Sequence, residues 1–259
     1  MTSQFASPFD GSGPAARRQG MTRRFYATAA IVLLVLMFVG FGRFYVQGRA
    51  YPDRELAPPI RSLLIWHAIT MTAWMVLFVV QPLLIVAGRR SVHMALGKAG
   101  AVLAAVVVVL GYWVGIAATR IAPAELVIWG LSPRAFMTVP LIGMTTFALF
   151  VTVGIWQRRR PEIHRPMMLL AGLAAIPAAV SRIDTINTIY EGTIWADVFG
   201  PFFATVVLGA LLVGANWVLV GRLDRWLAGG FALLAAADVM ILRVATTGAW
   251  DRVATFLLG

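Results

Sequence analysis

The sequence predicts an all-α membrane protein, a polytopic helical bundle of about seven transmembrane helices. The chain of 259 residues is 60% hydrophobic and only 13% charged, which is far from the composition of a soluble domain. Apolar stretches of about 20 residues, the length that crosses a hydrocarbon core of about 30 Å, recur along it. Backbone groups find no water in lipid and the alternation of a β-barrel is absent, so these stretches are expected to be helices.

The expected spans follow one another with short polar connections. A secretory signal does not fit the first span, because its apolar run is long and no small-residue cleavage site follows closely. The last span is the weakest, because Asp238 and Arg243 interrupt it. The seven spans are expected at residues 25–46, 62–87, 95–118, 135–156, 165–183, 197–220 and 226–246.

This pattern divides the chain into three parts. Residues 1–20 are rich in Ser, Gly and Pro and are expected to form a disordered cytoplasmic tail. Residues 21–247 form the transmembrane domain. Residues 248–259 carry apolar side chains at helical spacing and predict a short amphipathic helix along the outer interface. Tryptophans near span ends predict an aromatic belt: Trp66, Trp129, Trp195 and Trp250 outside, Trp156 and Trp226 inside.

Charge predicts the orientation of the bundle. One set of connections is strongly basic, whereas the other mixes arginines with acidic residues. The positive-inside rule then places the N-terminus in the cytoplasm and, after seven spans, the C-terminus outside. A basic face that meets anionic lipid accounts for the net charge of +11 without a nucleic-acid partner. The basic set comprises Arg17, Arg18, Arg23, Arg24, Arg89, Arg90, Lys98, Arg158, Arg159, Arg160, Arg165, Arg222 and Arg225.

Three connections repeat one pattern, in which arginines end one span and a polar, ligand-capable residue opens the next. Each connection belongs to a helical hairpin, and the three hairpins run the same way, so the pattern predicts one helix plus three hairpins in a parallel repeat. The connections read Gly88-Arg89-Arg90-Ser91-Val92-His93, Arg158-Arg159-Arg160-Pro161-Glu162-Ile163-His164 and Gly221-Arg222-Leu223-Asp224.

The polar residues of these connections form a candidate inner site. Imidazole nitrogens commonly ligate haem iron, copper and zinc, and two histidines from neighbouring helices suit axial haem ligation in a bundle. His93 and His164 are therefore candidate ligands of b-type haem or a transition metal, with Asp224 as a third metal ligand. Gln81 lies nearby in the sequence pattern. The alternative is that these residues cap helices or bond lipid phosphate beside the arginines.

A second group of polar residues lies in the outer half: Arg43, His67, Arg182, Asp184 and Asp238. His67 is about 30 Å in depth from the inner end of its span, so it shares no site with the other histidines. An unpaired carboxylate near mid-membrane costs several kcal/mol, so Asp238 is expected to be paired or protonated, with Arg182 or Arg243 as the nearest partner by depth. The group suits either structural ion pairs or a substrate or proton site.

Several function classes can be excluded. The chain has no cysteine, which removes disulfides, thiolate metal sites and a cysteine nucleophile. Its only lysine, Lys98, lies near the start of the third span, so no retinal Schiff base forms on the last one. Its three histidines are too few for the four axial ligands of a two-haem membrane cytochrome. The motifs of zinc proteases, serine hydrolases and P-loop NTPases are also absent.

Two motifs carry a resemblance to known proteins. The stretch from His67 to Gly97 and the run Arg160-Pro161-Glu162-Ile163-His164-Arg165-Pro166-Met167-Met168-Leu169-Leu170 resemble a group of bacterial membrane proteins without a settled activity, as does Gly248-Ala249-Trp250. More remotely, the chain is similar to a family of unknown function with an arginine-rich turn followed by His-x-x-x-Gly. Members often carry histidine where this chain has Asp224. The resemblance implies a multi-pass protein of the bacterial inner membrane.

Three function classes remain open at this stage. The first is an electron-transfer protein that holds haem or a metal through His93 and His164. The second is a small-solute transporter or binding module that uses the outer group. The third is a non-catalytic assembly subunit. The sequence does not decide whether the protein is an enzyme, and it indicates no particular protein partner.

Overall fold

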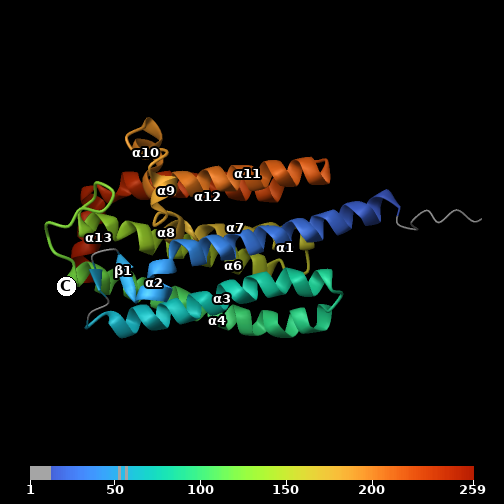
Figure 1. The fold of residues 1–259 in the computed structure, drawn as a ribbon, viewed down its shortest axis with the longest axis horizontal. Helices are drawn as coiled ribbons and strands as arrows, with labels where there is room; N and C mark the ends of the chain where they lie inside the picture. Colours follow the sequence, from blue (N-terminus) through green and yellow to red (C-terminus); the bar gives the residue numbers. More distant parts are fainter. Residues whose placement is uncertain (1–12, 52–53, 56–57) are drawn as a thin grey trace, which may run out of the picture.

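A computed structural model describes residues 13–51, 54–55 and 58–259, and it confirms the all-α membrane fold. In this part of the chain, seven helical segments are long and apolar enough to cross a membrane. They run side by side along the long axis of the molecule (Figure 1). Their main helices are α1 (Pro14–Gly40), α3 (Arg61–Val86), α4 (Arg90–Ile121), α6 (Thr138–Trp156), α7 (Pro161–Ala175), α11 (Phe203–Val220) and α12 (Arg225–Ala245).

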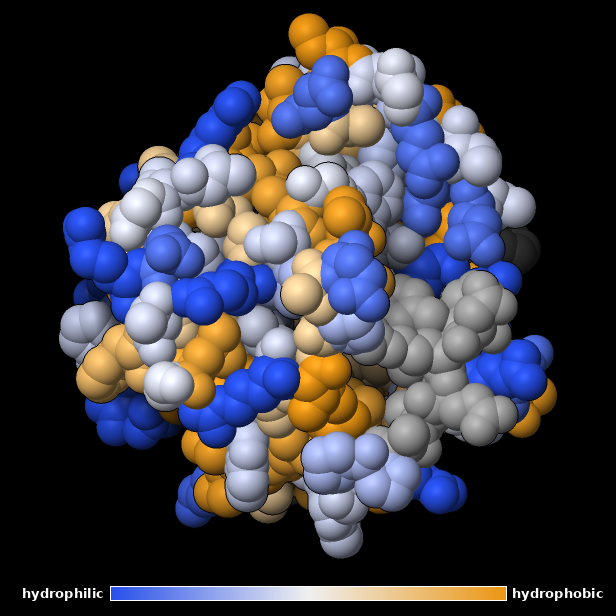
Figure 2. Space-filling view, turned by 90° about the vertical axis from the view of Figure 1, so that its left-hand side faces the viewer, coloured by the Kyte–Doolittle hydropathy of each residue, from blue (hydrophilic) through white to orange (hydrophobic). Residues whose placement is uncertain are grey.

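Shorter elements gather at the end of the bundle where α1 stops. β1 and β2 form a small antiparallel pair there. Figure 2 looks onto this end and shows hydrophilic side chains spread between apolar patches. The elements are α2 (Gly42–Gln47), β1 (Arg49–Tyr51), β2 (Arg54–Glu55), α5 (Pro133–Phe136), α8 (Pro177–Val180), α9 (Asp184–Asn187), α10 (Ile194–Phe199), the 3-10 helix η1 (Gly200–Phe202) and α13 (Gly248–Leu258).

The start of α1 differs from the expected boundary. The helix begins at Pro14, a residue whose fixed φ suits the first turn, so residues 14–20 are helical and not part of a disordered tail. Residues 1–12 of the expected tail lie outside the described residues. At its other end α1 stops at Gly40, where the backbone of Ala179 in α8 lies so close that a Cβ would not fit. This glycine lets the two helices approach each other.

α7 is the most buried of the spans. Of its most apolar window, 67% is buried inside the protein, compared with 22% for α3, α4 and α12. It contacts α1, α3, α6 and α12, so helices surround it. Its mean hydropathy of 1.4 is the lowest of the seven. A span enclosed by protein does not have to be as apolar as one that faces lipid, because its polar groups find partners in neighbouring helices.

Small residues bring α11 against its neighbours. Phe231 of α12 and Leu173 of α7 both pack directly on Gly209 of α11, and a Cβ at this position would overlap both side chains. One turn further, Gly214 has open space around it. Close approach of helices at glycine is a common device in membranes, where apolar burial does not favour one helix contact over lipid.

The C-terminal helix α13 docks on the bundle. Its amphipathic pattern is as expected, but Trp250 does not join an aromatic belt, because it is 8% exposed. With Ala254 it packs on Met137 and Leu141, and its indole N–H donates to the carbonyl of Arg134 at 2.9 Å. The helix therefore covers the end of the α5–α6 segment. Trp66, Trp156 and Trp195 are at least half exposed, in keeping with positions facing lipid or its interface.

The packing at Gly209 gives a first prediction. Gly209→Ala should lower the free energy of unfolding by about 1–3 kcal/mol, because the added methyl group overlaps Phe231 and Leu173. Gly214→Ala, on the same helix, should be neutral or stabilising by up to about 1 kcal/mol, because alanine favours helix and meets no atom there. Reversible unfolding in mixed detergent micelles measures both. Equal effects of the two substitutions would contradict this packing.

Candidate functional site

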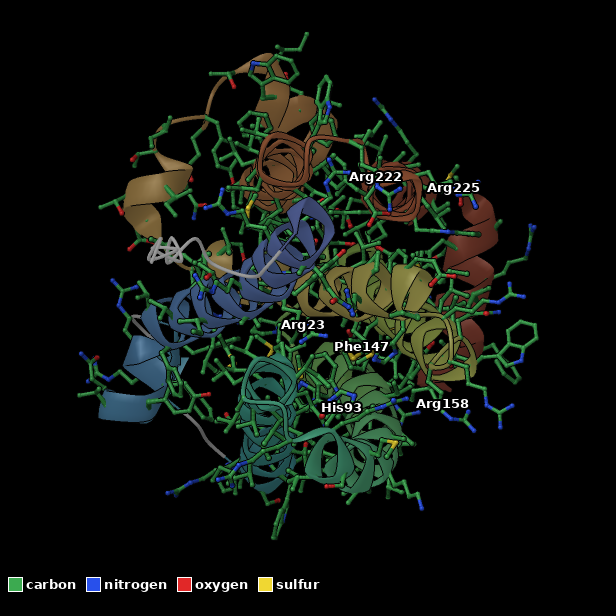
Figure 3. All side chains as sticks on the ribbon, turned by 90° about the vertical axis from the view of Figure 1, so that its right-hand side faces the viewer. Arg23, His93, Phe147, Arg158, Arg222 and Arg225 are labelled. Atoms are coloured by element: carbon green, nitrogen blue, oxygen red, sulfur yellow. The ribbon has the colours of Figure 1, made fainter. Side chains whose placement is uncertain are left out.

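Two of the three residues predicted for the inner site meet at one end of the bundle. We call this the basic end: it is where α1 begins and where the α3–α4, α6–α7 and α11–α12 connections lie. Figure 3 looks onto it, with Arg158, Arg222 and Arg225 toward the rim and His93 and Arg23 among the helices. The side chains of His93 and His164 face each other here, with ring centroids 6.3 Å apart and ring planes at 87°.

Each of these histidines is held by a backbone carbonyl of the preceding helix. His93, in the first turn of α4, has its Nδ1 3.3 Å from the carbonyl oxygen of Gln81 in α3. His164, in the first turn of α7, has its Nδ1 2.8 Å from the carbonyl oxygen of Gly154 in α6. Two hairpins thus build the same contact.

The contact of His164 satisfies a helix end. Gly154 lies in the last turn of α6, where carbonyls lack their usual intrahelical donor. The N–H of Arg158, four residues on, bonds instead to the carbonyl of Ile155 at 3.2 Å. His164 supplies the missing donor, which anchors its ring where α7 starts.

These contacts determine the tautomer of both rings. A carbonyl oxygen only accepts, so Nδ1 of each ring must donate and carry the proton. In the neutral ring the lone pair then lies on Nε2. Neutral imidazoles oriented in this way are the usual metal-ligating form of histidine, since a hydrogen bond at one nitrogen orients the other.

Asp224 has a different structural role from that of the two histidines. It is the N-cap of α12 and accepts hydrogen bonds from the N–H groups of Trp226 at 3.0 Å and Leu227 at 3.2 Å. Its charge also interacts with Tyr26 of α1. The described residues contain no group of three or more His, Asp or Glu side chains placed to hold a metal ion, so the structure does not bring Asp224 together with the two histidines.

Polar atoms without hydrogen-bond partners accumulate around the histidine pair. Both side-chain amide atoms of Gln81 and the Nε of Arg23 are buried without a hydrogen-bond partner, whereas the buried hydroxyl of Tyr26 interacts with Asp224. Gln81 also packs against Gly97, one turn after His93. Arg23 and Tyr26 both interact electrostatically with Arg165, which follows His164. Sequence reasoning placed Gln81 here but missed Tyr26, whose spacing of three residues from Arg23 is the only signal.

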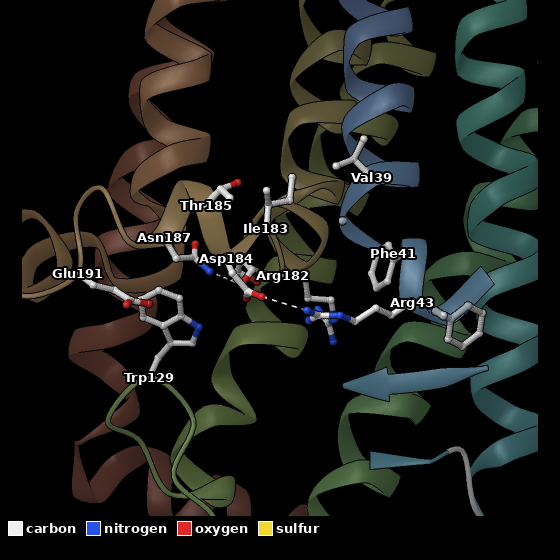
Figure 4. A pocket seen from close by; sticks show the side chains of 13 residues that line it. Val39, Phe41, Arg43, Trp129, Arg182, Ile183, Asp184, Thr185, Asn187 and Glu191 are labelled. Atoms are coloured by element: carbon white, nitrogen blue, oxygen red, sulfur yellow. Dashed lines mark hydrogen bonds and ion pairs between the residues drawn. The ribbon is translucent and has the colours of Figure 1, made fainter. Parts of the chain in front are cut away.

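The outer group separates into three places. Arg43 and Asp184 form an ion pair at 3.2 Å on the wall of a cavity of about 470 Å³ (Figure 4). Arg182 lies on the same wall, with its guanidinium 4.9 Å from the ring centroid of Phe41, and it donates to the carbonyl of Ala178. Neither His67 nor Asp238 lines this cavity.

The cavity also has an aromatic wall. Trp129 has a φ of 51°, a conformation that bulky residues rarely adopt, and it stacks on Tyr190 with ring centroids 6.2 Å apart. Burial raises the pKa of Tyr190 to about 12, so its hydroxyl stays protonated and donates to Oδ1 of Asn187 at 3.2 Å. The sequence assigned Trp129 to the aromatic belt, whereas the structure places it on the cavity.

His67 and Asp238 lie inside the bundle. His67 packs against Gly111 of α4, which is about 27 Å along that helix from His93, so the expected separation of the histidines is reproduced. Nδ1 of His67 is buried without a hydrogen-bond partner. Asp238 is only 5% exposed. The two ion pairs among the described residues are Arg43–Asp184 and Arg134–Asp251, so the pairing of Asp238 with Arg182 or Arg243 expected from depth is not found.

The fold and its sites define an integral membrane protein with seven apolar helices. No family model, curated protein or solved structure matches the chain.

The cap at α12 gives a prediction that separates two roles of Asp224. Asp224→Ala should destabilise the protein by about 1 kcal/mol, because two N–H groups lose their acceptor. Asp224→Asn should keep most of the stability, because asparagine caps equally well without the charge. Detergent unfolding compares the two variants. Equal destabilisation by both substitutions would indicate that the stability depends on the negative charge of Asp224 and not on its capping hydrogen bonds.

Proposed function

We propose that the protein binds b-type haem between His93 and His164 and takes part in electron transfer. The observation that carries this proposal is the geometry of the two rings: their centroids are 6.3 Å apart, and a backbone carbonyl engages Nδ1 of each. A bond of about 2.0 Å from each Nε2 to one metal ion would put two imidazole centroids about 6 Å apart. His93 and His164 would be the residues that hold the iron, since Nδ1 of each ring is already engaged by a carbonyl and Nε2 is left to bind it.

The surroundings of the pair also suit the anionic edge of a haem. Arg23 has a buried Nε without a hydrogen-bond partner, and Arg165 lies close enough to interact with it. The side-chain amide of Gln81, which has no hydrogen-bond partner, is a further donor. Charged and polar donors of this kind can bind carboxylate groups. When bound, haem would supply one-electron chemistry, while His93 and His164 would hold it and the carbonyls of Gln81 and Gly154 would fix their orientation.

The haem proposal is tested by reconstitution. Detergent-purified protein titrated with haemin should give the Soret and visible bands of a six-coordinate low-spin haem. His93→Ala and His164→Ala should each weaken binding about 100-fold or more, since loss of even an outer-shell partner costs about 10–100-fold. His67→Ala is the matched control and should bind like the unchanged protein, because His67 lies far along the helix from the pair.

Binding that persists in both alanine variants would contradict the proposal, as would a protein that takes up no haem. Metal analysis of the same preparation extends the test to a single transition-metal ion. A preparation without haem or metal would favour the second candidate function described below, solute binding at the opposite end of the bundle.

We further propose that the basic end faces the cytoplasm of a bacterial inner membrane and meets anionic lipid there. The exposed arginines of that end support this orientation through the positive-inside rule. The family resemblance of the His67–Gly97 and Arg160–Leu170 motifs supports the same membrane. We propose no nucleic-acid partner, because lipid accounts for the charge.

The orientation is testable by single-cysteine labelling, because the chain has no cysteine of its own. Ser91→Cys places a thiol at the exposed start of α4, and Ala124→Cys places one in the exposed connection at the other end. A membrane-impermeant maleimide added to intact spheroplasts should label Ala124→Cys and should label Ser91→Cys only after permeabilisation. The unchanged protein gives the background. The reverse pattern would overturn the orientation.

A second candidate function is solute binding at the opposite end. The observation that favours it is the cavity of about 470 Å³, a size within the range of small-molecule sites. Its wall combines the Arg43–Asp184 ion pair with the aromatic rings of Phe41 and Trp129. Charges of both signs beside aromatic surface suit a small zwitterionic solute. No comparable pair of oriented ligands occurs on this wall, so the histidine pair remains the better supported site.

A further inference from the structure

Two buried polar side chains lie on the packed faces of α11 and α12. Asp238 of α12 is 5% exposed and Thr205 of α11 is 1% exposed. The hydroxyl of Thr205 has no hydrogen-bond partner, and neither of the ion pairs among the described residues includes Asp238. Buried polar groups in membrane spans are costly and rare, so two together need an explanation.

Packing contacts on either side place Asp238 opposite the first turn of α11. Phe231 packs on Gly209, and Leu242 packs on Gly200 just before α11 starts. Asp238 follows Phe231 by two helical turns and precedes Leu242 by one, so the three share a face of α12. Thr205 precedes Gly209 by one turn on α11. Asp238 and Thr205 therefore occupy the same layer between two observed contacts.

The end of α7 lies in this layer as well. Leu173 packs on Gly209 beside Phe231, and α7 stops at Ala175. The hydrogen bond from the N–H of Ile176 to the carbonyl of Leu173 is long, at 3.5 Å, and Pro177 has no N–H to donate. The N–H groups of Ala179 and Val180 bond to Ile176 and not to α7.

The terminal carbonyls of α7 therefore lack their usual donors inside a buried part of the bundle, where Leu173 and Ala174 are both buried. The negative end of the helix dipole adds to the charge of a carboxylate in the same layer.

We propose that Asp238, Thr205 and the terminal carbonyls of α7 form a site for a monovalent cation, and that this cation is Na⁺. A carboxylate, a hydroxyl and the carbonyls of an interrupted membrane helix are hard oxygen ligands of the kind that coordinate Na⁺ in transporters. One positive charge balances the single carboxylate. Among the described residues Asp238 belongs to no group of three or more His, Asp or Glu side chains that could hold a metal ion, which disfavours a divalent ion.

The missing hydrogen bond of Thr205 distinguishes this site from a simple protonated carboxyl. A proton on Asp238 satisfies one acceptor and leaves the other oxygens of the layer unbonded. Two oxygens that each lie about 2.4 Å from a shared cation are further from each other than two hydrogen-bonded oxygens, which lie about 2.8 Å apart. Thr205 is buried without a partner, as expected for an oxygen whose ligand is an ion. The proposal does not depend on a cofactor at the basic end.

The test is the thermal stability of the detergent-purified full chain as NaCl replaces KCl at constant ionic strength. Na⁺ should raise the midpoint of unfolding in a saturable way, because a ligand that binds only the folded state stabilises it. Asp238→Asn should remove the Na⁺-specific rise. Thr205→Val, which keeps the shape of the side chain, should weaken Na⁺ binding about tenfold and move the saturation curve accordingly.

The matched control is Asp197→Asn, which removes an exposed carboxylate from α10 and should leave the Na⁺ response unchanged. If Asp238→Asn does not fold, Thr205→Val and direct binding of radioactive ²²Na⁺ still decide the question. Equal stabilisation by NaCl and KCl would overturn the proposal. So would a Na⁺ response that persists unchanged in Thr205→Val, or a stability that depends on pH alone.

Discussion

The burial of α7 is the constraint on which the rest of the structure depends. In a bilayer, a backbone group that leaves a helix must find its partner within the protein, because lipid supplies none. α7 contains Pro166 and stops at Ala175, and only the short helix α8 continues the segment as far as Val180. It can do so because α1, α3, α6 and α12 enclose it and its Leu173 packs directly on Gly209 of α11. A lipid-facing helix interrupted in this way would expose unbonded carbonyls to hydrocarbon.

Both proposed sites lie at the ends of this one helix. At its start the N–H groups and neighbouring arginines create a positive region, which suits a neutral imidazole and anionic groups. At its end the unbonded carbonyls create a negative region, which suits a cation. The polarity of one helix would therefore favour opposite ligand chemistry at the two proposed sites, one near His164 and the other near Leu173.

The features of the fold that depend on short stretches of sequence could be predicted from the sequence. Hydropathy over about 20 residues defines a span, so all seven spans and the helical tail were predictable. The repeated connections also indicated that His93 and His164 occupy equivalent positions, which agrees with their matching carbonyl contacts. Depth alone, however, did not predict partners. Arg243 is exposed and Arg182 lies beside Phe41, since the direction in which a side chain points depends on helix rotation, which no local pattern records.

The docking of α13 has a consequence for the order in which the protein is completed. Trp250 and Ala254 come after all seven spans in the sequence, yet they pack on Met137 and Leu141 at the start of α6. Arg120 and Arg134, from the ends of α4 and α5, reach the same helix through Leu257 and Thr255. That end of the bundle thus cannot close until α13 has been synthesised, so it closes later than the contacts among the spans that precede it.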